Sequence, residues 1–294
     1  MDFGSDLIAD GVRAERAGAL DRALESYQSV AASATDPSVI AEALTREADV
    51  HRARCDWDAA LAAARRAQET AEKANLSQRL AEAVNAEANV LMCTGDFIGA
   101  STKYELIAAK SVDPRLCGIA MQNLGSIYAQ CGQPKAAERA FTESLSSFRK
   151  ADYKRGQAIA LNNLGRLALD SNDCAHARLL LESALNLARQ EEDHDLAALA
   201  SLNLAGAHCV EGALDRAQDL AMAAMGYFSD CANRFREIEC LRLIGDINLQ
   251  LEDRPNAERC YRLALNLAEQ IGSEPELKLT MDKLSALSQP PVAS

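Results

Sequence analysis

Asparagine side chains recur at a fixed spacing through the middle of the chain. Asn123, Asn163 and Asn203 follow one another at intervals of 40 residues. The position just before these asparagines, with its equivalents in flanking segments, holds Asn85, Gln122, Asn162, Leu202 and Arg242. The position four residues after that one holds Asn89, Ser126 and Arg166. An amide group offers both donors and an acceptor, so a ladder of amides can pair with an extended peptide backbone. The spacing therefore indicates a peptide-binding surface.

A second ladder lies one helical turn earlier in the same segments. Its slot holds Ile119, Ile159 and Leu199, and in flanking segments Glu42, Glu82 and Glu239. If this slot faces the same groove, the site is apolar in its middle and acidic toward its ends. Such a site suits an extended segment with apolar side chains and flanking Lys or Arg. Two alternatives stay open: the amides satisfy only helix ends or water, and the apolar side chains pack against a neighbouring helix pair.

No pattern of residues indicates catalysis, a metal site or a cofactor. The glycines are scattered singly rather than gathered in a phosphate-binding loop, and no H-E-x-x-H or G-x-S-x-G motif occurs. His51 and His208 share one repeat position, where a structural role is the better interpretation. The nine cysteines lack C-x-x-C spacing, which predicts buried, reduced thiols. We expect a protein that is not an enzyme.

The elements that position these residues follow from a repeat of 37 or 40 residues. One alanine marks each copy: Ala23, Ala60, Ala100, Ala137, Ala177, Ala217 and Ala257. Five residues earlier stands a turn position, occupied by Gly18, Cys55, Gly95, Gly132, Asn172, Gly212 and Glu252. Seven residues before that, only Gly or Ala occurs: Gly11, Ala48, Ala88, Gly125, Gly165, Ala205 and Gly245. Each copy therefore predicts two antiparallel helices that cross closely at the small residue and are joined by a tight turn.

This arrangement resembles the tetratricopeptide repeat. The shared features are a leucine before the small residue, as in Leu124-Gly125, a glycine turn, the alanine, and an aromatic such as Phe141 four residues later. The resemblance covers about residues 5–271 as seven repeats and implies an all-α, right-handed α-α superhelix with the first helices lining a concave groove. The repeats exceed the usual length and lack its closing proline, so they resemble the longer-repeat branch of kinesin light chain-type adaptors. In that branch, asparagines at the matching place hold bound peptides.

We expect a single solenoid over residues 1–288, closed by a capping helix at 274–288 and followed by a disordered tail at 289–294. Apolar residues at 277, 281, 284 and 287 are the expected packing face of the cap. The predicted repeats span approximately residues 5–35, 37–75, 77–111, 114–151, 154–191, 194–231 and 234–271.

Net charge and hydropathy restrict the classes of partner that the protein can bind. The formal net charge is −12, which disfavours nucleic acid and anionic membranes because both attract clustered Lys and Arg. The chain shows neither a signal peptide nor a membrane span, so we expect a cytoplasmic monomer. The lysines of a carboxylate clamp are missing, which disfavours a reader of C-terminal carboxylates. The main hypothesis is an adaptor that binds a peptide or protein segment; the alternatives are a peptide sensor that switches an output partner, and homotypic assembly through the end repeats.

Overall fold

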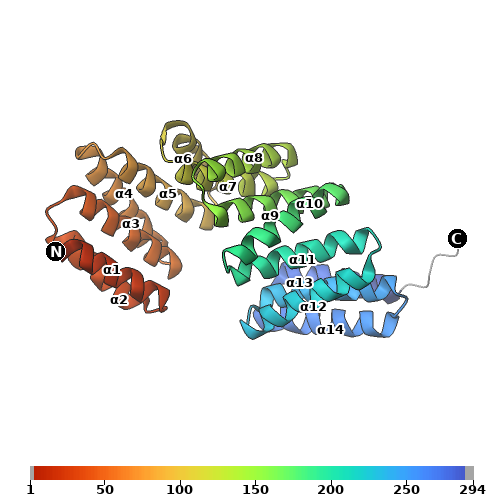
Figure 1. Ribbon diagram of the computed structural model, residues 1–294. Coiled ribbons are helices and arrows are strands. Elements are labelled where there is room, and N and C mark those ends of the chain that lie inside the picture. Colours follow the sequence, from red (N-terminus) through yellow and green to blue (C-terminus); the bar gives the residue numbers. More distant parts are fainter. Residues whose placement is uncertain (1–2, 289–294) are drawn as a thin grey trace. The chain divides into compact units, whose positions relative to one another are not determined.

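The computed structural model describes residues 3–288, and over that range the chain forms fifteen α-helices and no strand (Figure 1). The helices are α1 (Phe3–Arg16), α2 (Leu20–Ser33), α3 (Pro37–Ala53), α4 (Trp57–Lys73), α5 (Ser77–Cys93), α6 (Phe97–Lys110), α7 (Pro114–Gln130), α8 (Pro134–Lys150), α9 (Lys154–Asp170), α10 (Cys174–Gln190), α11 (His194–Val210), α12 (Leu214–Asp230), α13 (Arg234–Gln250), α14 (Arg254–Ile271) and α15 (Glu274–Ser288). The predicted all-α class is confirmed. The predicted disordered tail at 289–294 lies outside the described residues.

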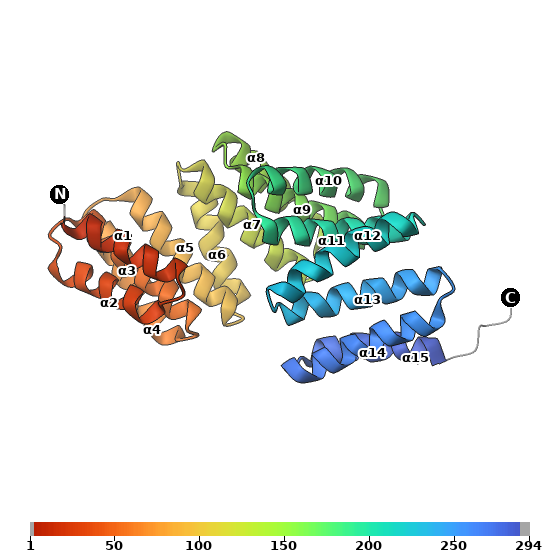
Figure 2. The same cartoon turned by 60° about the horizontal axis from the view of Figure 1, so that its bottom comes forward.

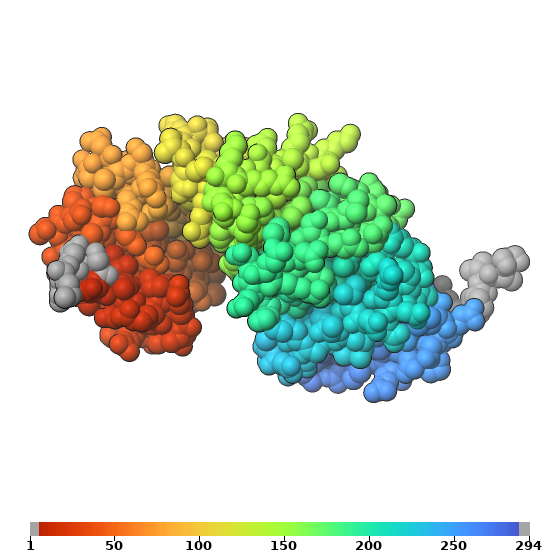
Figure 3. All heavy atoms as spheres, in the orientation of Figure 1, coloured from red at the N-terminus to blue at the C-terminus, as the bar shows by residue number. Residues whose placement is uncertain are grey.

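The helices form two compact units, which divide after Tyr153. Unit one contains the four hairpins from α1 to α8; unit two contains the three hairpins from α9 to α14, and then α15. Within each unit, a second helix packs on its own first helix and on the first helix of the next hairpin. In the space-filling view, the neighbouring hairpins of each unit touch (Figure 3). This packing is that of an α-α solenoid; the continuity of one solenoid over residues 1–288 stays a prediction.

Every predicted turn inside a hairpin adopts a left-handed backbone. The residues with positive φ, between 60° and 83°, are Gly18, Cys55, Gly95, Gly132, Asn172, Gly212 and Glu252. At Gly132 the next amide, that of Gln133, donates to the carbonyl of Tyr128 at 2.8 Å and so closes the end of α7. Glycine and asparagine suit this conformation because they tolerate positive φ.

The small residues lie where the two helices of a hairpin cross. A Cβ atom added to Gly125 would lie 2.5 Å from the Phe141 ring, and one added to Gly245 would lie 2.4 Å from the Tyr261 ring. Both rings are buried. The prediction that nothing larger fits at these crossings is therefore confirmed.

Helix α15 packs on α14 (Figure 2), with Leu277 of the predicted face against a core cluster that includes Ala264, but Met281 lies outside the contact. Thr280 and Glu276 are buried, whereas Met281 is 55% exposed. The physical reason is polar: the Glu276 carboxylate pairs with Arg242 of α13, and the Lys283 ammonium pairs with Asp246 of α13 at 2.7 Å. The expected face at 277, 281, 284 and 287 is therefore confirmed at Leu277 and corrected at Met281.

The cysteines are free thiols, but only two are buried, Cys209 and Cys240. The predicted burial is wrong for four exposed thiols, which lie at turns and helix ends: Cys55, Cys93, Cys131 and Cys231. Between residues 3 and 288, no helix has the length and apolarity that a bilayer crossing requires.

Candidate functional site

The first helices of the hairpins carry all of the predicted site residues. Each first helix contacts the next one in its unit: α3 contacts α5 and α5 contacts α7, and in unit two α9 contacts α11 and α11 contacts α13. We call the surface of α3, α5 and α7 that includes Glu42, Glu82, Asn85 and Gln122 the first-helix face of unit one. The predicted ladder divides between the units: Asn85, Asn89, Ile119, Gln122, Asn123 and Ser126 belong to unit one, and Ile159, Asn162, Asn163, Arg166, Leu199, Leu202, Asn203 and Arg242 belong to unit two.

Two amides of unit one brace the helices. The Asn89 Oδ1 atom accepts a hydrogen bond from the Tyr104 hydroxyl at 2.7 Å and another from Asn123 Nδ2 at 3.2 Å. These bonds join α5, α6 and α7. Asn89 and Asn123 are therefore engaged in holding neighbouring helices together, a role that neither the groove prediction nor its alternative of helix ends or water described.

Two other amides on the first-helix face lack partners. Asn85 on α5 and Gln122 on α7 occupy the same repeat position, and both residues are partly exposed. Their carbonyl oxygens, Asn85 Oδ1 and Gln122 Oε1, are nevertheless covered and accept no hydrogen bond. An uncompensated buried acceptor costs about 1–3 kcal/mol. Within residues 3–288, no protein group pairs with the oxygen of either side chain.

In unit two, the corresponding amide is satisfied. Asn203 Nδ2 donates to Asn162 Oδ1 at 2.9 Å, and Asn162 is only 2% exposed. Leu202 is also buried and lies in a core cluster with Ala224 and Phe228. The prediction that Asn162 and Leu202 line an open groove is corrected, because their side chains are enclosed by the packing of neighbouring hairpins.

The remaining predicted residues differ in their surroundings. Ile159 and Leu199 pack partly against core clusters of unit two, as the second alternative predicted. The Ser126 hydroxyl donates to the backbone carbonyl oxygen of Gln122, one turn earlier in the same helix, at 3.1 Å. Arg242 is paired with Glu276. Ile119 and Asn163 are partly exposed, and Arg166 is exposed.

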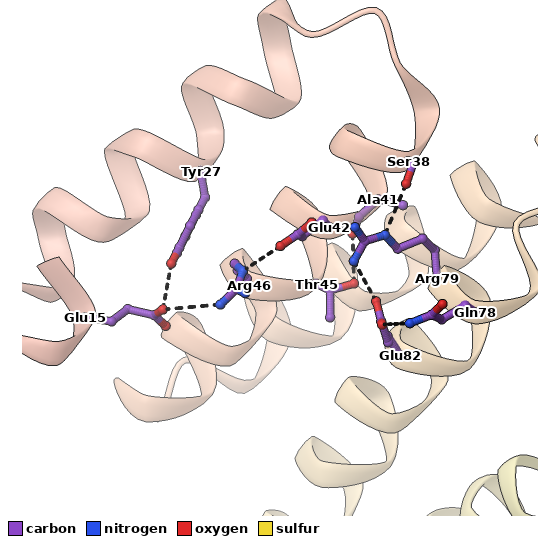
Figure 4. Close-up of polar contacts among 10 residues, drawn as sticks. All are labelled: Glu15, Tyr27, Ser38, Ala41, Glu42, Thr45, Arg46, Gln78, Arg79 and Glu82. Carbon is purple, nitrogen blue, oxygen red and sulfur yellow. Dashed lines mark hydrogen bonds and ion pairs between the residues drawn. The ribbon is translucent and has the colours of Figure 1, made fainter. Parts of the chain in front are cut away.

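A chain of alternating charges crosses α1, α3 and α5 in unit one (Figure 4). Glu15 faces Arg46 with an Oε2–Nη1 distance of 4.0 Å, and Arg46 Nε donates to Glu42 at 3.3 Å. Arg79 then pairs with Glu42 at 2.5 Å and with Glu82 at 2.9 Å. The carboxylates expected to make this end of the site acidic are therefore largely compensated. Arg46 and Arg79 were not among the predicted site residues.

Both arginines had a signal in the sequence. Arg46 lies four residues after Glu42, the spacing of neighbours on one helix face. Arg79 lies three residues before Glu82, the equivalent of Glu42 one 40-residue repeat later, and reaches Glu42 from the next first helix. In unit two, Glu239 of the same slot pairs with Arg236 at 2.5 Å.

Comparison with known proteins identifies the repeat. Residues 118–190 match the family model described as tetratricopeptide repeat. This stretch of the chain consists of tetratricopeptide repeats. The resemblance to the kinesin light chain branch stays an expectation. A search of curated proteins finds no match.

Solved structures share the tetratricopeptide fold at low identity. The apo form of RapI is 15% identical, with a TM-score of 0.68 over 92% of this chain and 98% of that chain. A signal-transduction ATPase with a tetratricopeptide repeat sensor, from Pyrococcus horikoshii, is 14% identical, with a TM-score of 0.74 over 95% of this chain and 44% of that one. The apo quorum sensor NprR from B. thuringiensis is 18% identical, with a TM-score of 0.68 over 89% and 75%.

Two tetratricopeptide hairpins bury a carboxylate where later hairpins carry Leu or Ile. Glu87 is 5% exposed and is held by Lys103 at 2.5 Å, Gln68 at 3.0 Å and Arg65 at 3.2 Å. Burial alone would raise the pKa of Glu87, but these hydrogen bonds hold it below its usual value. Glu47 is 6% exposed; Gln28 donates to its Oε1 at 3.3 Å, while Oε2 has no hydrogen-bond partner.

The histidines fit structural positions in the repeats. His208 is buried, and the side chain of His51 is 13% exposed. His51 Nδ1 lies 3.3 Å from an Asp56 oxygen, and His208 Nδ1 lies 3.6 Å from a Glu211 oxygen. Over the part of the chain that the structure describes, no three His, Cys, Asp or Glu side chains are grouped so as to hold a metal ion.

Proposed function

We propose that this tetratricopeptide-repeat protein is a non-enzymatic interaction module that binds an extended segment of a partner protein on the first-helix face of unit one. The observation that carries the proposal is the pair of unsatisfied amides, Asn85 and Gln122. They occupy one repeat position on two adjacent first helices, and each is partly exposed although its carbonyl oxygen is covered.

A peptide backbone is the ligand that suits such amides. Its N–H and C=O groups alternate, so a rotated Asn or Gln side chain can donate to one and accept from another. Rotation toward the ligand would also end the cost of the unpaired oxygens. The bonded pair Asn89 and Asn123 lies on the same two helices and holds them in register for this contact.

A peptide sensor is the second candidate. It is favoured by the similar solved structures, two of which are described as sensors. In this alternative, the same face binds the peptide and the packing of the hairpins changes to control an output partner. The nine free thiols support a reducing compartment such as the cytoplasm for either function.

The proposal is tested by selection from a library of random dodecapeptides displayed on phage, with the full-length protein as bait. We expect extended sequences to be enriched on the wild type. The double variant Asn85→Leu/Gln122→Met should lose their binding, because its side chains have similar shape but no amide.

Asn266→Leu provides the matched control, since Asn266 is an exposed amide on the second helix α14. It should bind the selected peptides as the wild type does. The proposal fails if no peptide is enriched, or if the double variant keeps wild-type affinity.

A further inference from the structure

The charge chain next to the unsatisfied amides has an uneven composition. It contains three carboxylates, of Glu15, Glu42 and Glu82, but only two guanidinium groups, of Arg46 and Arg79 (Figure 4). Because the charges alternate, the row of paired side chains begins and ends with a carboxylate, that of Glu15 and that of Glu82. One negative charge is therefore left without a cation.

The two ends are closed by neutral groups. The Tyr27 hydroxyl donates to Glu15 at 2.6 Å, in the hairpin of α1 and α2. At the other end, Gln78 Nε2 donates to Glu82 at 3.2 Å, and Gln78 is exposed. The Glu15 and Glu82 side chains are almost equally exposed, at 26% and 27%, but only Glu82 lies on the helix that carries Asn85.

Each nitrogen of the Arg79 guanidinium already donates one hydrogen bond within the protein. Its Nε donates to the Ser38 hydroxyl at 3.2 Å, and its two Nη atoms are taken by Glu42 and Glu82. A carboxylate of the ligand could reach only the second N–H of an Nη atom, where the neighbouring carboxylates of Glu42 and Glu82 would repel it. A cation, by contrast, extends the alternation without breaking a bond.

Glu82 lies three residues before Asn85 on α5, so the two side chains are neighbours on one helix face. We propose that a Lys or Arg side chain of the bound segment pairs with Glu82 while the backbone next to it contacts Asn85. This inference rests on the proposed function. It assigns the charge specificity of unit one to a single carboxylate.

The experiment is a double-mutant cycle with a peptide selected from the dodecapeptide library. Its basic residue is replaced by norleucine, and the dissociation constants of both peptides are measured by fluorescence anisotropy. On the wild type we expect the norleucine peptide to bind about fivefold more weakly, and on Glu82→Gln we expect the two peptides to bind alike. Glu239→Gln, in the same slot of unit two, should leave the fivefold ratio unchanged.

A gain-of-charge variant keeps the test decisive if Glu82→Gln folds poorly. Gln78→Glu places a second carboxylate at the Glu82 end of the chain and should raise the ratio above that of the wild type. Selected peptides that lack a basic residue, or an equal ratio on wild type and Glu82→Gln, would overturn the inference. If those peptides still required Asn85 and Gln122, the proposed function would stand; if no peptide were enriched, both would fall.

Discussion

At the scale of single residues, one repeat position shows how context sets the cost of a charge. The residue before the small crossing residue is Leu124, Leu164, Leu204 or Ile244 in the later hairpins, but a glutamate in the second and third. Lys103, Gln68 and Arg65 compensate Glu87. At the positions that correspond to Lys103 and Gln68, the helices around Glu47 carry Ala63 on α4 and Ala31 on α2. Glu47 therefore lacks counterparts of both cations that hold Glu87; its neighbours are one amide, Gln28, and His51, whose Nε2 lies 3.9 Å away.

Replacing Glu47 by the residue of the later hairpins should stabilise the protein. We expect Glu47→Leu to raise the free energy of unfolding by about 1 kcal/mol, because it removes a covered, unpaired carboxylate oxygen. Urea unfolding followed by circular dichroism measures the change. Glu87→Leu is the control and should lower stability, since it removes three bonds; a loss of stability in Glu47→Leu would contradict this explanation.

The residue scale is also where sequence reasoning was weakest. The periodicity placed the amides on one face, but it could not distinguish Asn89, which accepts two hydrogen bonds, from Asn85, whose oxygen accepts none. That difference depends on which side chain of the neighbouring helix lies within about 3 Å. The same limit explains Leu202, which is covered by Phe228 of its own hairpin and by Cys240 of the next.

At the scale of helices and turns, the sequence was a strong guide. The turn positions have left-handed backbones, and the small residues lie against buried rings, because both features depend on contacts inside one hairpin. The face of α15 was predicted correctly at Leu277 and wrongly at Met281. Its apolar spacing favoured Met281, but the ion pairs to Arg242 and Asp246 on another helix decided the orientation.

The crossing of α7 and α8 gives a test at this scale. Gly125→Ala should lower the free energy of unfolding by about 1–3 kcal/mol, since its Cβ would lie 2.5 Å from the Phe141 ring. The loss should shrink in a Phe141→Ala background. Gly226→Ala is the matched control: its Cβ meets no atom within 4 Å, and it should stabilise α12 by about 0.5–1 kcal/mol. Thermal unfolding of the four variants checks these values.

Thiol reactivity reports on the packing of α13. Burial raises the pKa of the Cys240 thiol to about 12. A raised pKa keeps the thiol protonated at pH 8, and the thiolate is the reactive form, so alkylation of Cys240 by iodoacetamide should be at least about tenfold slower than that of exposed Cys93. Mass spectrometry of the labelled protein measures both rates. Equal rates would show that α13 opens readily in the folded protein.

At the scale of the whole molecule, adaptor and sensor differ in what the ligand does to the fold. A sensor should change its radius of gyration when a selected peptide binds, whereas a static adaptor should not. Small-angle X-ray scattering with and without saturating peptide distinguishes them. Sedimentation over a range of concentrations tests the third hypothesis, and a constant monomer mass would exclude homotypic assembly through the end repeats.

The central claim is that Asn85 and Gln122 are costly in the free protein because they serve a ligand. Its most direct test measures the unfolding midpoint and the affinity for a selected peptide on the same double variant, Asn85→Leu/Gln122→Met. We predict an unfolding midpoint equal to or above that of the wild type, together with a loss of affinity of more than about tenfold. A lowered midpoint with unchanged affinity would contradict the claim and assign both amides to the support of the fold.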